Sequence, residues 1–211
     1  MEAVTYGDFD YVPEGLTPEA QLELHITAID LTTHWQRCSV ISDMIAGYIA
    51  HAYPGGFLGP KSAIYSSIST IFQELIENAA RYSRQRGGAI TIRIKHYSRV
   101  VRIELQNDTM PSVGQRFEEY LKTLFAAEDL DALHMQIMEN QTRGGRQSGI
   151  GLLWLLKDYP VKLGMRFMRE SDDHETITVR AYYHMEMSDY DMTDAADATD
   201  APQAPPRSGL M

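Results

Sequence analysis

Apolar residues recur at helical spacing in two long stretches of the first half of the chain. The spacing predicts one apolar helix over residues 35–53 and a second over residues 61–83. Between them, HAYPGGFLGPKS contains two prolines and three glycines, which break the helical pattern. A further helix is expected over residues 17–30, because TPEA resembles an N-cap, a first-turn proline and an early acid.

Strand patterns begin after residue 88, where apolar and polar residues alternate. AITIRIKHYSRVVRIELQN breaks near HYS, which predicts an antiparallel hairpin. VKLGMRFMRESDDHETITVRAYYH alternates on both sides of an acidic turn and predicts a second hairpin. Helical spacing returns over residues 113–141, as one broken helix or two, and GLLWLLKDY begins a short helix near Leu152.

The order of these elements predicts the fold class. Helices, a hairpin, more helices and a second hairpin indicate an α+β sandwich, with four or so mainly antiparallel or mixed strands covered by helices on one face. We expect residues 1–16 to be an extended lead-in and residues 17–184 to form one domain, to which residues 17–60 add N-terminal helices. Residues 185–211 carry six acids and one arginine, a net charge of −5, and are expected to be a disordered acidic tail.

The charge balance limits what this chain binds. Its formal net charge is −10, so it has no basic excess to displace counterions from nucleic acid, and no nucleic-acid partner is expected. Cys38 is the only cysteine, which excludes an internal disulfide. No apolar run approaches the roughly 20 residues of a membrane span, and the N-terminus lacks the pattern of a signal peptide. We therefore expect a cytoplasmic protein without a membrane partner.

The stretch QELIENAARYS places a carboxylate and an amide one turn apart. Glu74 and Asn78 are neighbours on the surface of the predicted helix. Such a pair could bind Mg²⁺ and orient a hydroxyl, because Mg²⁺ prefers oxygen ligands and one Asn oxygen suffices when phosphates supply the others. Glu74 would then be free to act as a general base. The alternative is that the pair forms the solvated edge of an amphipathic helix.

The stretch GGRQSGIGLLWLLKD places glycines directly before a predicted helix. Gly149 and Gly151 would let the backbone approach a ligand with exposed amide N–H groups, and the helix start adds partial positive charge. Arg143 and Arg146 would add further charge. Together these features predict a phosphate site. The alternative is a flexible loop whose glycines cap the neighbouring helix.

Four stretches in order, ELIENAARYS, LQNDT, GGRQSGIGLLWLLKD and ETITV, resemble the GHKL ATP-binding fold of histidine kinases, gyrases, Hsp90 and bacterial anti-sigma-factor kinases. The resemblance spans residues 64–184. It implies ATP and Mg²⁺ as ligands, with Asn78 binding Mg²⁺ and Glu74 serving as the catalytic base. Arg81 falls where many histidine kinases place a basic residue near the phosphates.

The stretch SGIGL resembles the second glycine box of this family. The resemblance implies that Gly149 and Gly151 close over the phosphates. Ile150 and Leu152 would line the purine side of the same site. The family's leading glycine is replaced here by Gln147.

The residues that would recognise adenine depart further from the family pattern. The first glycine box, Asp-x-Gly, is replaced by LQNDTMP, so either Asn107 or Asp108 would read the adenine amino group. Either Thr176 or Thr178 would match the strand threonine near adenine. With these departures the sequence resembles the divergent SiaB-type protein kinases of bacterial partner-switching systems.

Two functions of different classes follow from the resemblance. The first is an ATP-dependent serine/threonine protein kinase that phosphorylates a small regulatory partner protein, as anti-sigma-factor kinases do. The second is a noncatalytic interaction module with weak or no nucleotide binding, which uses the N-terminal helices for partner docking or homodimerisation. A stand-alone ATPase is less favoured, because we expect a single domain.

Overall fold

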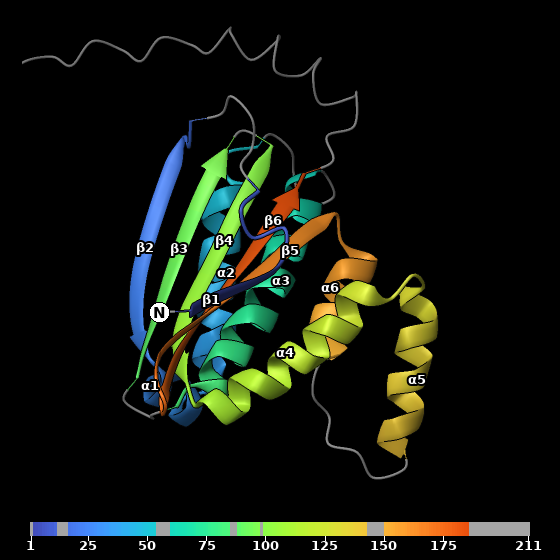
Figure 1. Cartoon of the computed structure of the whole chain (residues 1–211). Coiled ribbons are helices and arrows are strands. Elements are labelled where there is room, and N and C mark those ends of the chain that lie inside the picture. Colours follow the sequence, from blue (N-terminus) through green and yellow to red (C-terminus); the bar gives the residue numbers. More distant parts are fainter. Residues whose placement is uncertain are drawn as a thin grey trace, which may run out of the picture.

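The structure of the chain is a computed structural model, which describes residues 2–11, 17–53, 60–84, 88–97, 99–142 and 150–185 (Figure 1). The strands are β1 (Glu2–Gly7), β2 (Ala20–Thr27), β3 (Ala89–Tyr97), β4 (Val100–Thr109), β5 (Val161–Ser171) and β6 (His174–His184). The helices are α1 (Ala28–Thr33), α2 (Gln36–Ala50), α3 (Pro60–Tyr82), α4 (Pro111–Ala126), α5 (Leu130–Thr142) and α6 (Ile150–Asp158).

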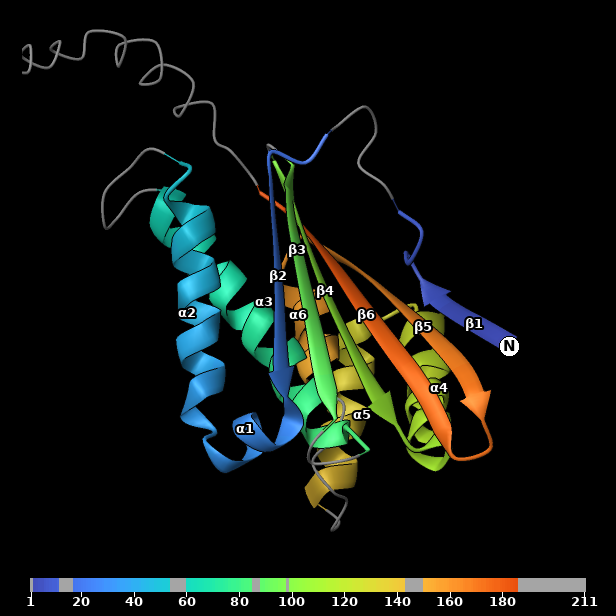
Figure 2. The same cartoon turned by 90° about the vertical axis from the view of Figure 1, so that its left-hand side faces the viewer.

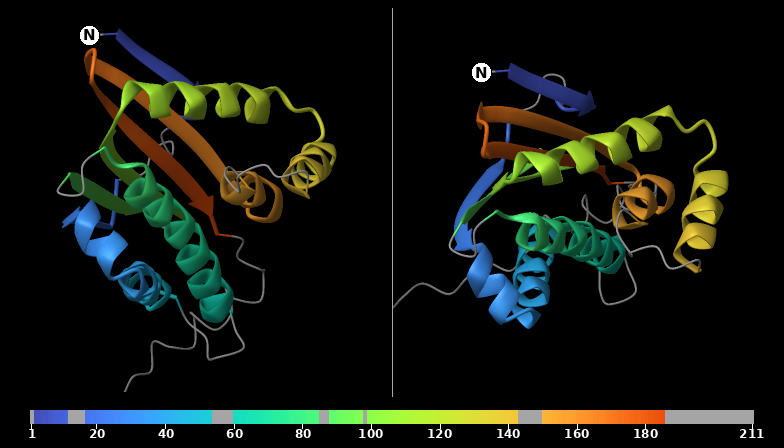
Figure 3. Two further views of the ribbon diagram at one scale, coloured as in Figure 1. Left: turned by 90° about the horizontal axis from the view of Figure 1, so that it is seen from below. Right: turned by 60° about the horizontal axis from the view of Figure 1, so that its bottom comes forward.

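Six strands form one antiparallel sheet in the order β1-β5-β6-β4-β3-β2. Helices α2, α3, α4 and α6 lie on one side of this sheet, which we call the helix face, and α2 packs along α3 (Figures 2 and 3). We call the opposite side the open face. The arrangement confirms the predicted α+β class and both predicted hairpins, although the sheet has six strands rather than four.

The helix predicted over residues 17–30 is wrong for most of its length. Ala20–Thr27 form the edge strand β2, which pairs antiparallel with β3, and only Ala28–Thr33 are helical. The sequence AQLELHIT alternates strictly, with the apolar residues half-buried and the polar ones exposed. A period of two fits a strand with one wet face. The prediction was wrong because TPEA resembles the start of a helix, although the residues after it alternate as in a strand.

The described part of the lead-in, residues 2–11, begins with a strand of the sheet. Glu2–Gly7 pair with β5 and form the other edge strand, β1. Gly7 has φ +62° and turns the chain onto the open face, a conformation that favours glycine. Gly164 of β5 permits this crossing, because a Cβ there would lie 2.2 Å from the backbone nitrogen of Phe9.

The core lies between the sheet and α3. Ile68, Ile71, Phe72 and Ile76 follow an i, i+3, i+4, i+8 pattern along one face of α3 and are fully buried. They pack with the apolar side chains of the helix face, so α3 is fixed over the centre of the sheet. The predicted helices over residues 35–53 and 61–83 correspond to α2 and α3.

The charged region predicted as one broken helix or two is two helices, α4 and α5. The break is set by Asp129, whose carboxylate accepts hydrogen bonds from the backbone N–H groups of Asp131 and Ala132 at 2.9 and 3.0 Å. This is a helix N-cap, which fixes where α5 begins. The short helix predicted near Leu152 is α6.

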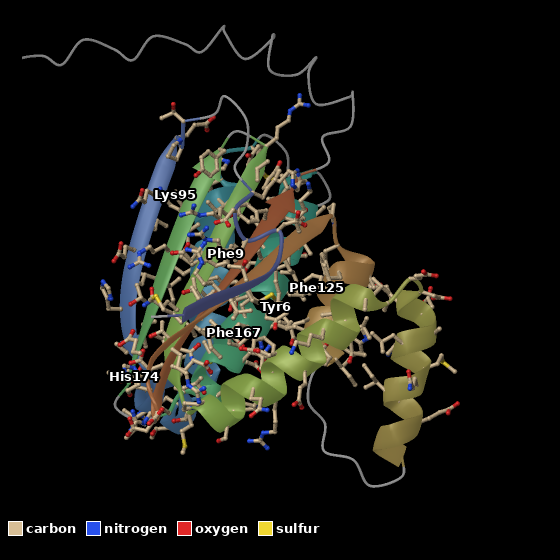
Figure 4. The ribbon with its side chains drawn as sticks, in the orientation of Figure 1. Tyr6, Phe9, Lys95, Phe125, Phe167 and His174 are labelled. Carbon is tan, nitrogen blue, oxygen red and sulfur yellow. The ribbon has the colours of Figure 1, made fainter. Side chains whose placement is uncertain are left out.

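The open face buries a charge cluster around Glu104. Its carboxylate accepts a hydrogen bond of 2.6 Å from Arg180 and one of 3.1 Å from Arg93. Arg180 and Arg166 both lie over the ring of Phe9, each at 4.0 Å from the ring centroid. Figure 4 marks the position of Phe9 on this face. Burial alone would raise the pKa of Glu104, but the bonds from Arg180 and Arg93 outweigh it and hold that pKa below its ordinary value.

At the C-terminal end, the described residues finish at Met185, which packs into the fold. Met185 is buried, and its backbone N–H donates to the carbonyl of Arg99 at 2.9 Å. The rest of the predicted tail lies outside the described residues. Among the helices of the described residues, none has the length and apolar character needed to cross a membrane.

Candidate functional site

A cavity of about 490 Å³ lies between the helix face of the sheet and helices α3, α4 and α6. Figure 3 shows these three helices beside one another over the same face of the sheet. The volume is within the range of small-molecule sites. The polar groups in its lining are Asn78, Arg81 and Tyr82 of α3, Asn107 of β4, and Arg116 and Tyr120 of α4. The apolar lining includes Leu75, Leu105, Val113, Phe117, Leu152, Ile177 and Val179.

Helix α3 delivers the predicted polar pair to this region. Asn78 lines the cavity, and Glu74 is one turn earlier on the same helix. Glu74 is half-buried against the first turn of α6, since a Cβ on Gly151 would lie 2.1 Å from Glu74 Oε2. Gly151 therefore lets α6 start against the Glu74 carboxylate. The amides of a first helical turn carry partial positive charge, which favours an anion there.

The surroundings of Glu74 change its acidity. Burial raises its pKa, the nearby carboxylate of Glu77 raises it further, and the guanidinium of Arg81 lowers it in part. The net pKa lies above the ordinary value for a glutamate. A carboxylate with a raised pKa is a stronger base than an exposed one. Arg81 itself lies 3.8 Å from Glu77 and 5.7 Å from the ring centroid of Trp35.

Strand alternation separates the two candidates for adenine recognition. Asn107 is buried and lines the cavity on the helix face. Asp108 is the next residue of β4 and lies on the open face, where it accepts a hydrogen bond of 3.3 Å from Thr176 and pairs with His174. The structure therefore brings Asn107 into the candidate site and does not bring Asp108 there.

Neither candidate threonine of β6 reaches the cavity. Ile177 and Val179 line it, whereas Arg180 and Tyr182 contact Phe9 on the open face. Thr178 shares the face of Arg180, because residues two apart on a strand point the same way. Thr176 lies on that face too, so the predicted role of a strand threonine is not supported by its position.

The helix face of β6 presents Glu175 beside the cavity instead. Glu175 is 6% exposed, and its Oε2 has no hydrogen-bond partner within the described part of the chain. A Cβ on Gly114 of α4 would lie 1.6 Å from this oxygen. Burial and the charge of Glu118 raise the pKa of Glu175, against a smaller opposing effect of Arg169. No sequence signal marked Glu175, because it stood at the turn end of a predicted hairpin.

The second glycine box is described only in part. Gly149, Arg143 and Arg146 lie outside the described residues. Ile150 begins α6 and is half-buried, whereas Leu152 is buried and lines the cavity.

Two polar residues of α4 join the site without having been singled out from the sequence. Arg116 and Tyr120 both line the cavity. The spacing of Phe117, Tyr120 and Leu121 already indicated a helix with one apolar face, but it did not show what that face covers.

The residues at the site could hold a metal ion only if a bound molecule, such as a phosphate compound, supplied further coordinating oxygens. The described part of the chain contains no group of three or more His, Cys, Asp or Glu residues that could hold a metal. Asn78 offers one oxygen at the cavity wall. Mg²⁺ accepts such a site when phosphate oxygens and water complete its shell. The donor set therefore fits Mg²⁺ carried by a phosphate ligand.

Comparison with models of known protein families gave no match for this chain, and no curated protein sequence matched it. The geometry of the cavity is therefore what supports a functional assignment.

Proposed function

We propose that the cavity binds ATP with Mg²⁺ and that the protein transfers the γ-phosphoryl group to a serine or threonine of a small regulatory partner protein. One observation carries the proposal: residues from α3, β4 and α6 that are distant in sequence meet at one cavity. Asn78, Asn107 and Leu152 line it together, with Glu74 beside Gly151 at its α6 side.

The cavity lining suits a nucleotide. Leu105, Ile177 and Val179 of the sheet give an apolar floor for a base, and the amide of Asn107 can both donate and accept hydrogen bonds at its edge. Arg81 and Arg116 supply positive charge for phosphates. These two charges act locally although the whole chain is acidic, because charges further away than about 8 Å are largely screened at physiological salt.

Asn78 would hold Mg²⁺ through its side-chain oxygen, with the phosphates as further ligands. When bound, the ion neutralises charge on the phosphate oxygens. Asn78 lies one turn from Glu74 on a buried helix, so the metal-binding oxygen and the candidate base keep a fixed separation.

Glu74 accepts the proton of the acceptor hydroxyl in the proposed reaction. The hydroxyl oxygen forms a bond to the γ-phosphorus, the bond to the β–γ bridging oxygen breaks, and ADP leaves with that electron pair. The first-turn amides of α6, which Gly151 places against Glu74, stabilise the negative charge on the transferring group. The raised pKa of Glu74 favours the proton transfer.

The chemical step is tested by transfer of label from γ-labelled ATP to proteins in an extract of the source cells. The wild type should label one small acceptor on serine or threonine, and Glu74→Gln should not. Glu119→Gln is the matched control, because Glu119 is exposed on α4 and does not line the cavity. Equal labelling by wild type and Glu74→Gln would remove Glu74 as the base.

A second candidate function is an interaction module that forms a homodimer through α2. The observation that favours it is a stripe of exposed apolar residues, Val40, Met44 and Tyr48, on successive turns of α2. Their exposed fractions are 65%, 53% and 51%. Such a stripe is typical of a helix that docks on a partner.

Light scattering tests this candidate. It predicts a dimer for the wild type and a monomer for Met44→Lys. Met135→Lys on α5 is the control, since Met135 is similarly exposed but lies off the stripe. A monomeric wild type that binds Mg-ATP tightly would leave the kinase as the better assignment.

A further inference from the structure

A second cavity, of about 400 Å³, lies on the other side of α3 from the first. Its walls are the end of α3 and the short helix α1. The polar lining consists of two guanidinium groups and three hydroxyls, those of Arg81, Arg84, Thr32, Thr33 and Ser83. Two alanines complete the lining, and no carboxylate from the described residues is part of it. This lining differs from the largely apolar one of the first cavity.

The two guanidiniums are held loosely enough to bind something else. Arg84 donates to Asp173 at 2.8 Å, but the Asp173 side chain is 74% exposed, and an exposed pair of this kind contributes little stability. Arg81 lies 3.8 Å from Glu77, at the long end of an ion pair. An incoming anion could therefore displace either carboxylate.

The charge in this cavity is positive despite the helix end beside it. The C-terminal carbonyls of α3 contribute about half a negative charge, whereas the two arginines contribute two full positive charges. The hydroxyls of Thr32 and Ser83 already donate to the carbonyls of Ala28 and Ala79, at 2.9 and 2.7 Å. The guanidiniums are thus the main donors for a ligand.

We propose that this second cavity is a binding site for a phosphate-type dianion, held by Arg81 and Arg84. Guanidinium forks match the oxygens of phosphate and form charge-assisted hydrogen bonds with them. The volume exceeds that of free phosphate, so a small phosphate monoester fits as well as inorganic phosphate. The two ligands present the same phosphate group to the arginines, and their relative affinities distinguish them.

Arg81 also lines the first cavity, so the two sites share one residue. A guanidinium engaged by an anion on the α1 side is not available to a ligand on the α4 side. Occupation of one site should therefore weaken binding at the other, and by linkage the effect is reciprocal. This coupling rests on the proposed nucleotide function, whereas the dianion site itself does not.

The test begins with calorimetric titration of inorganic phosphate and of phosphoserine into the full chain, without nucleotide. The wild type should bind, and Arg84→Gln should bind about tenfold more weakly, the cost of one charge-assisted contact. Asp173→Asn is the matched control: it breaks the same ion pair but keeps the guanidinium, so binding should be unchanged or tighter. Tighter binding of phosphoserine than of phosphate would identify a monoester as the ligand.

Two further variants show which cavity the phosphate occupies. Arg116→Gln removes a cation that lines only the first cavity, and should leave phosphate binding unchanged if phosphate occupies the second. Arg99→Gln removes an exposed charge at the β3–β4 turn and should also have no effect. Absence of binding to the wild type, or equal loss in Arg84→Gln and Arg116→Gln, would overturn the proposed site.

The coupling is measured by titrating Mg-ATP with and without saturating phosphate. ATP affinity should fall about fivefold in the wild type at a phosphate concentration that just saturates its site, and should fall less in Arg84→Gln, whose weaker site the same concentration fills only in part. Phosphate binding with an unchanged ATP affinity would contradict the coupling and leave the dianion site intact. Phosphate binding to a protein that binds no ATP would contradict the proposed function and not this site.

Discussion

The contacts and the burial of two glutamates, Glu74 and Glu104, are not indicated by the residues next to them in sequence. The spacing of Glu74 and Asn78 already predicted that they share one helix face. The contact of Glu74 with Gly151 joins residues from two different helices, and no local pattern contains it. Glu104 stands at a polar position of an alternating strand and would be expected in solvent. It is buried because residues 8–11 cross the open face above it.

We predict that Glu74→Gln raises the thermal stability of the protein at neutral pH. The pKa of Glu74 is raised in the folded state by burial and by Glu77, so the charged carboxylate opposes folding. This penalty is absent below the ordinary value of 4.5 and develops as pH rises through the folded pKa. Thermal unfolding at pH 4 and pH 7 checks this, and a variant less stable than the wild type at pH 7 would contradict it.

Glu104→Gln should have the opposite effect. Its pKa is lowered in the folded state, because Arg180 and Arg93 outweigh burial, so its stabilisation is present above the ordinary 4.5 and lost as pH falls through the folded pKa. Removing the charge leaves Arg180 without its carboxylate partner and Arg93 with only the exposed Glu23, and should cost about 3 kcal/mol at pH 7 in denaturant unfolding. Glu23→Gln, at an exposed partner of Arg93, should cost less than about 1 kcal/mol. Equal losses of stability in Glu104→Gln and Glu23→Gln would contradict the stabilising role of the Glu104 cluster.

At the scale of elements, long periodic segments could be predicted and the edge strands could not. Helices α2, α3 and α6 and the two hairpins follow from spacing that each segment carries itself. β1 has six residues and acquires its structure from β5, which is far away in sequence. β2 alternates cleanly, but the preceding TPEA favoured a helix start. Likewise, the face of the sheet on which Asn107 and Thr178 lie could be assigned only once the pairing of the strands was known.

Gly151→Ala tests the close approach of α3 and α6. The added Cβ would lie 2.1 Å from Glu74 Oε2, so the carboxylate must move, which a side-chain end can do. Stability should change by less than about 1 kcal/mol, because alanine is the better helix former. Phosphoryl transfer should nevertheless fall about 100-fold or more, as for a misplaced general base.

Gly47→Ala is the control for that variant. Its added Cβ would meet the ring of Tyr65 at 3.8 Å, an ordinary contact, so this change in α2 should stabilise the protein slightly and leave transfer unchanged. Full transfer activity in Gly151→Ala would show that the position of Glu74 is unimportant.

At the scale of the whole molecule, the two faces of the sheet are covered by different parts of the chain and hold different groups of residues. The helix face holds the core and the candidate nucleotide cavity, whereas the open face holds the Glu104 cluster under the N-terminal segment. Phe9 is buried against two arginines on the open face. Residues 8–11 are therefore part of the fold.

Phe9→Ala should cost about 3 kcal/mol of stability, the lower range for a buried phenylalanine, because part of its packing is against arginine side chains. Val4→Ala in the edge strand β1, at a side chain that is 37% exposed, should cost less than about 1 kcal/mol. Denaturant unfolding measures both. Similar, small losses would mean that the N-terminal segment is not held on the open face.

The central claim is that α3, β4 and α6 together form a nucleotide site with Asn78 at its metal-binding position. Calorimetric titration of ATP, with and without Mg²⁺, into wild type and Asn78→Ala tests it most directly. Gln73→Ala is the control, because Gln73 is on the same helix and bonds to Glu77 outside the cavity. The account predicts Mg²⁺-dependent binding that Asn78→Ala loses and Gln73→Ala keeps. Absence of ATP binding to the wild type would contradict it.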